Sequence, residues 1–423
     1  MSNNTAKWSL VSHLQTANSA SLSLISSSDN KTFTSQIFPT SENSGKQYAP
    51  WFLGLNHDKQ IILFDPESKN ISLSDAIPGD AVATYAYRQP NSNLMWFVND
   101  GDKEHGNDPL NCGDKGSTIT VIDKGSDTEA PKHIKTICVG HGHHVPTFIS
   151  PTLNQPDLPS IVYVSNLLGG DIVVLDNDPN NDTYLSITDT INLCEPEKEK
   201  DGRTGIPNNA FPHGKQFSSV TGKIYSLNNG YGTVAVINPL THEIESRIPL
   251  KGASNLLLSY DGKYLIGKGA DRKSNPDHVI GKLSVIDVEK EKIIHQYDVE
   301  DYYPSVYRFS ANGKKLYVTS AATGKDKQKN NLKINTLYVY DCQNLPELKL
   351  VKVIQTGNAD CGRRPIAFPE SGNGDLIFIP NPTDGTLDVI NGETDELMET
   401  IQISDEGGKE FNFSLWIPGV YGA

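Results

Sequence analysis

A short pattern of alternating apolar positions recurs seven times along this chain. Each copy begins at a small or polar residue and ends at Asp or Asn, two residue types that favour turns. Alternation with a period of two residues is typical of a half-buried strand, so each copy predicts one β-strand. The copies are KQIILFD (59–65), STITVID (117–123), GDIVVLD (170–176), GTVAVIN (232–238), GKLSVID (281–287), NTLYVYD (335–341) and GTLDVIN (385–391).

Further strands are predicted on both sides of these copies. The segment YPSVYRFSANGKKLYVTS (303–320) indicates two strands joined by an Asn-Gly turn, and residues 211–227 and 254–269 repeat this hairpin. Such turns, flanked by apolar alternation, are a strong hairpin signal. Another strand follows most copies, for example EIESRIPL (243–250). The repeating unit is therefore four antiparallel strands, called A to D in chain order.

Seven units of four strands, repeating about every 50 residues, predict an all-β fold: a single seven-bladed β-propeller domain over residues 1–423. The first unit lacks an obvious strand A. We expect ASLSLIS (20–26) or FNFSLWIP (411–418) to supply it, because a terminal strand would close the ring and remove its open edges. The expected blades are approximately 20–76, 78–138, 139–194, 207–250, 251–299, 300–356 and 357–404, with 405–423 as the closing segment.

The phrase SANGKKLYVTS followed by TLYVYD resembles the YVTN-type propellers, a group that is similar to the lactonase-like and cytochrome d1 propellers. The resemblance extends over most of the chain and implies the fold. It does not imply one function, because this fold carries lactonases, redox enzymes and scaffolds without chemistry.

Charge and composition narrow the functional classes. The net charge of −14 argues against binding to nucleic acid or to an anionic membrane surface, and the basic run 324–333 is expected to be a solvated loop. No apolar stretch has the length of a membrane span, and the first residues lack a secretory pattern, so we expect a cytoplasmic protein. The five cysteines are dispersed without a C-x-x-C motif, which favours free thiols over disulfides or a zinc site.

The segment VGHGHHVP (139–146) places three of the eleven histidines within four positions. In a propeller, the B–C loops and the D–A links between blades lie on one face, and these histidines fall in such a link. Histidine is the commonest metal ligand. We therefore predict a divalent transition metal (Cu, Fe or Zn) at the channel mouth, held by His105, His141, His143, His144 and His213. The alternative is a solvated Gly/His-rich loop without a metal.

Two other residues are predicted to lie near the same channel mouth. Arg364 enters the last blade and could orient a carboxylate or another anion by a bidentate contact, or else form an ion pair between blades. Asp80 could bind the metal or hold a histidine tautomer, or else belong to an ordinary loop turn.

Two functional hypotheses follow. The first is a metal-dependent enzyme that acts on a small molecule, with an oxidoreductase slightly favoured over a hydrolase or lactonase. The second is a scaffold or binding module without catalysis, in which long loops such as 99–117, 192–212 and 270–281 contact a protein partner.

Overall fold

The computed structural model describes most of the central chain and parts of both ends. Before residue 87 and after residue 402 only the backbone of the strands is described. The described residues are 7–15, 20–27, 33–39, 51–55, 61–65, 70–73, 83–99, 112–113, 116–123, 125, 131–142, 145–360, 364–368, 376–381, 383–402, 412–417 and 420–421.

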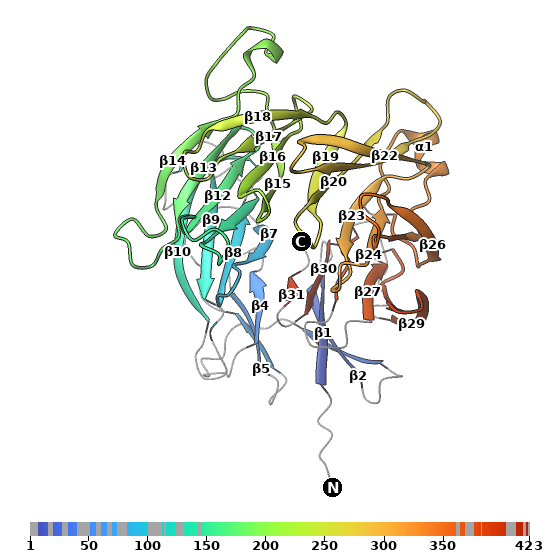
Figure 1. Cartoon of the computed structure of the whole chain (residues 1–423). Helices are drawn as coiled ribbons and strands as arrows, with labels where there is room; N and C mark the ends of the chain where they lie inside the picture. Colours follow the sequence, from blue (N-terminus) through green and yellow to red (C-terminus); the bar gives the residue numbers. More distant parts are fainter. Residues whose placement is uncertain are drawn as a thin grey trace.

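Five sheets contain four strands each, and every strand pairs antiparallel with the next strand along the chain (Figure 1). The first sheet contains β7 (Ala83–Arg88), β8 (Leu94–Asn99), β9 (Gly116–Asp123) and β10 (Lys132–His141). The second contains β11 (Pro146–Ile149), β12 (Ile161–Asn166), β13 (Asp171–Asp176) and β14 (Ile187–Asn192). The third contains β15 (Pro212–Ser218), β16 (Lys223–Asn228), β17 (Thr233–Ile237) and β18 (Ile244–Pro249). The fourth contains β19 (Ala253–Leu258), β20 (Tyr264–Asp271), β21 (Ile280–Asp287) and β22 (Lys292–Glu300). The fifth contains β23 (Pro304–Phe309), β24 (Lys315–Ser320), β25 (Thr336–Asp341) and β26 (Lys349–Gln355).

Three further sheets include the strands at both ends of the chain. Two have three strands: β4 (Trp51–Leu55), β5 (Ile61–Asp65) and β6 (Asn70–Leu73) form one, and β27 (Leu376–Asn381), β28 (Thr386–Asn391) and β29 (Glu396–Gln402) form the other. The third is five-stranded, in the order β3 (Phe33–Pro39), β2 (Ala20–Ser27), β1 (Lys7–Gln15), β30 (Asn412–Ile417) and β31 (Val420–Tyr421). The helical elements of the described chain are η1 (Pro196–Lys198) and α1 (Asp326–Asn331), and no helix there is long and apolar enough to cross a membrane.

The all-β prediction is confirmed, and the seven repeated phrases fall on β5, β9, β13, β17, β21, β25 and β28, one in each of seven sheets. The described strands nevertheless form eight sheets rather than seven. Neither 20–26 nor 411–418 joins the β4–β6 sheet, so that expectation is wrong. Both segments join β1, which pairs with β2 on one edge and with β30 on the other. The strand β1 (Lys7–Gln15), which the sequence pattern did not predict, lies between β2 and β30.

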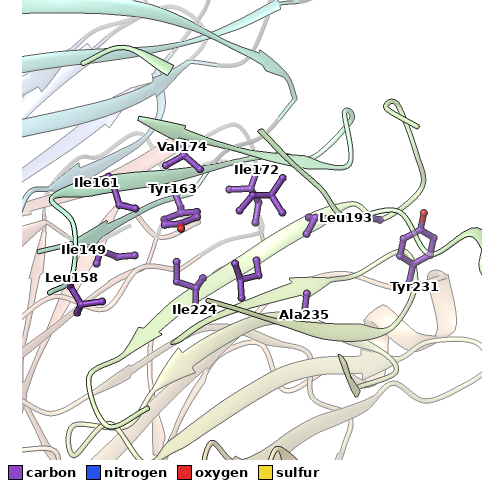
Figure 2. Close-up of a cluster of buried hydrophobic side chains, with 13 residues drawn as sticks. Ile149, Leu158, Ile161, Tyr163, Ile172, Val174, Leu193, Ile224, Tyr231 and Ala235 are labelled. Atoms are coloured by element: carbon purple, nitrogen blue, oxygen red, sulfur yellow. The ribbon is translucent and has the colours of Figure 1, made fainter. Parts of the chain in front are cut away.

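The hydrophobic core lies between neighbouring sheets, because residues at odd and even positions of a strand face opposite ways. In β12, Val162 and Val164 pack toward Trp96 of the β7–β10 sheet. Tyr163, between them, packs toward Ile224 of the β15–β18 sheet, and Figure 2 shows this second cluster. Each central sheet is therefore covered by a neighbour on both faces.

The expectation of free thiols is wrong for two of the five cysteines. A disulfide joins Cys112 to Cys138, whose Cα atoms are 5.3 Å apart. It ties the segment before β9 to the outer strand β10 of the same sheet. Of the remaining cysteines, Cys342 is buried and Cys194 is half-buried, and both are free thiols, whereas Cys361 lies outside the described residues.

The disulfide should contribute measurably to stability. It closes a loop with a sequence separation of 26 residues. For a loop of this size, chain entropy predicts that the Cys112→Ser/Cys138→Ser variant loses about 3.5 kcal/mol of free energy of unfolding, measured by urea denaturation. Reduction of the wild type should reproduce this loss, whereas Cys194→Ser should change little. Equal stability of oxidised and reduced protein would contradict the assignment.

Candidate functional site

The loops and links that we predicted to be functional lie on one face of the molecule. Because successive strands run antiparallel, the loops between the second and third strands and the links between sheets lie at the same end of the sheets. We call this the loop face. Four of its segments are 193–211, 250–252, 272–279 and 321–335.

The structure describes two of the five predicted metal ligands; His105, His143 and His144 lie outside the described residues. His141 is exposed at the end of the outer strand β10, opposite Gly116. His213 is half-buried in β15, the first strand of a sheet two places further along the chain.

His141 lies in the β7–β10 sheet and His213 in the β15–β18 sheet. Within the described part of the chain, no group of three His, Cys, Asp or Glu side chains could hold a metal ion. The metal site therefore stays a prediction. Testing this prediction requires substitution of the histidines in the link between β10 and β11.

The backbone before His141 is held by a close contact with the next sheet. Asn166 donates its side-chain amide to the Val139 carbonyl at 2.7 Å. Gly140 has a φ of +134°, and a Cβ at this position would lie 2.3 Å from the Asn166 Nδ2 atom. Only glycine leaves room for this contact, so it sets the direction in which the chain leaves β10. Burial raises the pKa of nearby Asp171, while its hydrogen bond from Asn166 and the field of His141 oppose that rise.

Arg364 is fully buried rather than open to a channel. Its guanidinium donates to the carbonyls of Pro380 (3.1 Å) and Ile334 (2.9 Å), and to the side-chain oxygens of Thr356 (2.8 Å) and Asn381 (2.8 Å). These acceptors belong to the β23–β26 and β27–β29 sheets. The geometry favours the structural alternative, because the guanidinium donates hydrogen bonds to groups on both sheets. Asp80 lies outside the described residues.

A cavity on the loop face was not anticipated from the sequence. Its volume is about 650 Å³, and its walls come from the β19–β22 sheet and from the segment that precedes β25. The lining residues are Lys251, Gly252, Ala270, Asp271, Arg272, Lys273, Lys282, Thr323, Gly324, Lys325 and Gln328. Five of these side chains are cationic and one is anionic.

Four of the five cations of this cavity have no carboxylate partner among the described residues. Lys282 pairs with Asp298 at 3.2 Å. None of Lys251, Arg272, Lys273 and Lys325 forms an ion pair with a carboxylate of the described chain. Four such cations in one cavity are unusual in a chain with a net charge of −14. We call this the cationic cavity.

The single carboxylate of the cationic cavity is engaged by its own loop. Asp271 accepts hydrogen bonds from the backbone N–H groups of Lys273 (2.9 Å) and Ser274 (3.0 Å) and from the Ser274 hydroxyl (2.6 Å). These bonds, first of all the one from the Ser274 side chain, lower the pKa of Asp271 to about 2. The carboxylate therefore stays ionised and shapes the turn that presents Arg272 and Lys273.

Gln328 joins the two walls of the cationic cavity. Its side chain is fully buried. Its amide nitrogen donates to the carbonyls of Arg272 (3.1 Å), Asn275 (2.7 Å) and His278 (3.4 Å), and its amide oxygen accepts from the Lys325 backbone at 3.0 Å. One side chain of α1 thus fixes the loop 272–279. On the other side of that loop, the Arg272 guanidinium lies 5.6 Å from the centre of the Tyr303 ring.

The sequence contained a signal for this site. Basic residues follow directly after strand ends at KG (251–252), DRK (271–273) and GKDK (324–327). Three such positions on one face of adjacent blades could have indicated an anion site. The reading of 324–333 as an ordinary solvated loop is incomplete, because Lys325 lines the cavity.

Comparison with known proteins identifies the fold but no family. No protein family and no curated protein matches the chain in sequence. Among solved structures, the periplasmic gluconolactonase of Pseudomonas aeruginosa is similar, with 14% identity and a TM-score of 0.54 over 86% of this chain and 98% of that one. A putative 6-phosphogluconolactonase of Bacteroides fragilis has 15% identity and a TM-score of 0.52 over 86% of this chain and 96% of that one.

A third similar structure is the hydrazine synthase of Kuenenia stuttgartiensis, with 14% identity and a TM-score of 0.50 over 75% of this chain and 85% of that one. The fold is that of the lactonase-like β-propellers, as the resemblance implied. Identities this low establish the fold alone, and function has to be argued from the site.

The role of Arg364 can be tested by stability. Arg364→Met should lower the free energy of unfolding by about 3–5 kcal/mol, because four acceptors lose a buried charged donor. Arg272→Met, at an exposed arginine of the cationic cavity, should change stability by less than about 1 kcal/mol. Chemical denaturation measures both. A stable Arg364→Met protein would instead favour the anion-binding role.

Proposed function

We propose that this protein binds a small molecule with at least two negative charges in the cationic cavity. The observation that carries the proposal is the set of four cations without carboxylate partners in a cavity of about 650 Å³. Ligand sites for small molecules have volumes of about 300–1,000 Å³, so the size fits. Bringing like charges together is unfavourable unless an anion offsets their repulsion.

The residue types also fit an oxyanion. Arg272 can make two parallel hydrogen bonds to a carboxylate or phosphate, and its position over Tyr303 limits the orientations of the guanidinium. Lys251, Lys273 and Lys325 act as mobile point charges from the other walls. Such a site supports binding by itself, and it would also orient an anionic substrate beside a catalytic group.

A metal-dependent enzyme is the second candidate, as an oxidoreductase or as a hydrolase or lactonase. The exposed position of His141 on the loop face supports it, because the GHGHH run starts there. A divalent Cu, Fe or Zn ion at His141, His143, His144, His213 and His105 would supply Lewis-acid or redox chemistry. Asp80 keeps its predicted role beside the metal in that candidate, whereas the buried Arg364 would contribute by holding the β23–β26 and β27–β29 sheets in place.

The architecture supports two further proposals. The eight sheets would form one closed ring, since β3 packs against both β6 and β29 and β1 pairs with β30.

The Cys112–Cys138 disulfide supports an oxidising compartment over the expected cytoplasm, because cytosolic thiols are kept reduced.

Anion binding can be measured directly. The Arg272→Gln/Lys273→Gln variant should bind citrate and sulfate about tenfold more weakly than the wild type in calorimetric titrations, because two of the four unpaired charges are removed. Raising the salt concentration should weaken wild-type binding. The Lys292→Gln/Lys349→Gln variant, which removes two exposed charges from outer strands, serves as the control. Equal affinities of all three proteins would contradict the proposal.

The metal candidate is tested by elemental analysis. Untagged protein, reconstituted with Fe, Cu or Zn and dialysed, should retain about one metal ion per chain if the histidines converge. The His144→Ala/His213→Ala variant should lose this metal and remain folded. Retention of the metal by the variant, or no metal above background in the wild type, would eliminate this candidate.

A further inference from the structure

His278 belongs to the same loop as the cationic residues Arg272 and Lys273, although it does not line the cavity. Its Nδ1 atom lies 2.7 Å from an Asp301 carboxylate oxygen and 3.8 Å from a Glu300 carboxylate oxygen. Glu300 is the last residue of β22 and Asp301 follows it directly, and we call these two residues the β22–β23 segment. The His278 side chain therefore fastens the far end of the loop 272–279 to the adjoining strands.

The same loop is fastened from the opposite side by α1. The carbonyl of His278 is one of the three acceptors of the buried Gln328 amide, together with Arg272 and Asn275. Asn331 of the same helix also donates to the Asp277 carbonyl at 3.1 Å. The position of Arg272 is thus linked to that of His278 through contacts that hold both ends of one short loop.

Negative charge surrounds His278. Asp301 and Glu300 face it from the β22–β23 segment, and Asp277 is its neighbour in the loop. Two cations contact these residues. The Lys327 ammonium of α1 is 3.4 Å from an Asp277 carboxylate oxygen, and the Lys333 ammonium donates a hydrogen bond to the Glu300 carbonyl. The hydrogen bond with Asp301 is the main reason why the pKa of His278 is raised above its ordinary value.

We propose that protonation of His278 tightens the loop 272–279 and thereby strengthens anion binding in the cationic cavity, so that the protein binds its ligand more tightly in mildly acidic conditions than in alkaline ones. This regulation rests on the proposed anion-binding function. Protonated His278 forms an ion pair with the Asp301 carboxylate, whereas neutral His278 keeps only a hydrogen bond to it. The attachment of the loop that carries Arg272 and Lys273 is then weaker.

The direction of the pH effect follows from the raised pKa. Below about pH 6.5, the ordinary pKa of histidine, the folded protein carries the full stabilising contribution of protonated His278. This contribution is lost as the pH rises through the higher pKa of the folded state. The histidine is partly exposed, and such ion pairs contribute little. We therefore expect only about a two- to fivefold difference in ligand affinity.

Sulfate is the probe for this experiment, because it stays doubly charged across the range in which histidine titrates. Wild type should bind sulfate about two- to fivefold more tightly at about pH 6 than at about pH 8.5, at constant ionic strength, in calorimetric titrations. His278→Asn can still hydrogen-bond Asp301 but cannot be protonated. It should bind sulfate equally at both pH values.

His242→Asn is the matched control. His242 also contacts an aspartate, with its Nδ1 atom 2.7 Å from Asp189, but this pair joins β14 to the turn before β18 and does not line the cationic cavity. This variant should retain the pH dependence of the wild type. An unchanged pH dependence in His278→Asn, or its loss in His242→Asn, would overturn the assignment to His278.

Hydrogen exchange of the loop separates this inference from the proposed function, because it needs no ligand. After correction for the intrinsic effect of pH, amides of residues 272–279 should be better protected in wild type than in His278→Asn at about pH 6, and equally protected at about pH 8.5. If wild type does not bind sulfate, the anion-binding function fails. If protection of the loop is the same in both proteins at both pH values, the His278 contact does not control the loop.

Discussion

The fold depends on one constraint: the central strands of the four-stranded sheets, such as β12 and β13, are buried on both faces and must be covered twice. In β12 and β13 every residue is buried. A sheet of this kind needs a neighbour on each side, and repetition around an axis meets that need. Val162 and Tyr163, adjacent in sequence, therefore belong to two different core clusters. The outer strands are far more exposed, as β14 and β26 show.

Polar contacts between sheets supplement this apolar packing near the inner strands. Arg364 connects the last two sheets of the described chain, and Lys215 reaches from β15 to the carbonyl of Val145 and the hydroxyl of Ser165, both at 2.8 Å. Burial lowers the pKa of Lys215 well below its ordinary value. Such buried groups require partners in fixed positions, so they set how neighbouring sheets align. The aligned sheets then form a rigid base for the loops.

The cationic cavity follows from that division of roles. Its cations sit on loops and strand ends, where charge is tolerated in water, while Gln328 and the Asp271 turn hold those loops in place. Positive charge concentrated on one face of an otherwise acidic protein gives that face a local potential opposite in sign to the net charge. The His278–Asp301 contact, which raises the pKa of His278, adds a titratable group to this arrangement.

The sequence alone determined the seven strands that carry the repeated phrases and the hairpins beside them, because the alternation in segments such as GDIVVLD (170–176) is local and the Asp-Gly and Asn-Gly turns mark hairpins. It also placed His141 and His213 on the loop face, which follows from strand direction. Tertiary structure decided everything that depends on distance. Pairing of β1 with β30 joins residues some 400 positions apart. The burial of Arg364 and the convergence of Lys251, Arg272 and Lys325 depend on how sheets pack, and no periodicity along the chain records that packing.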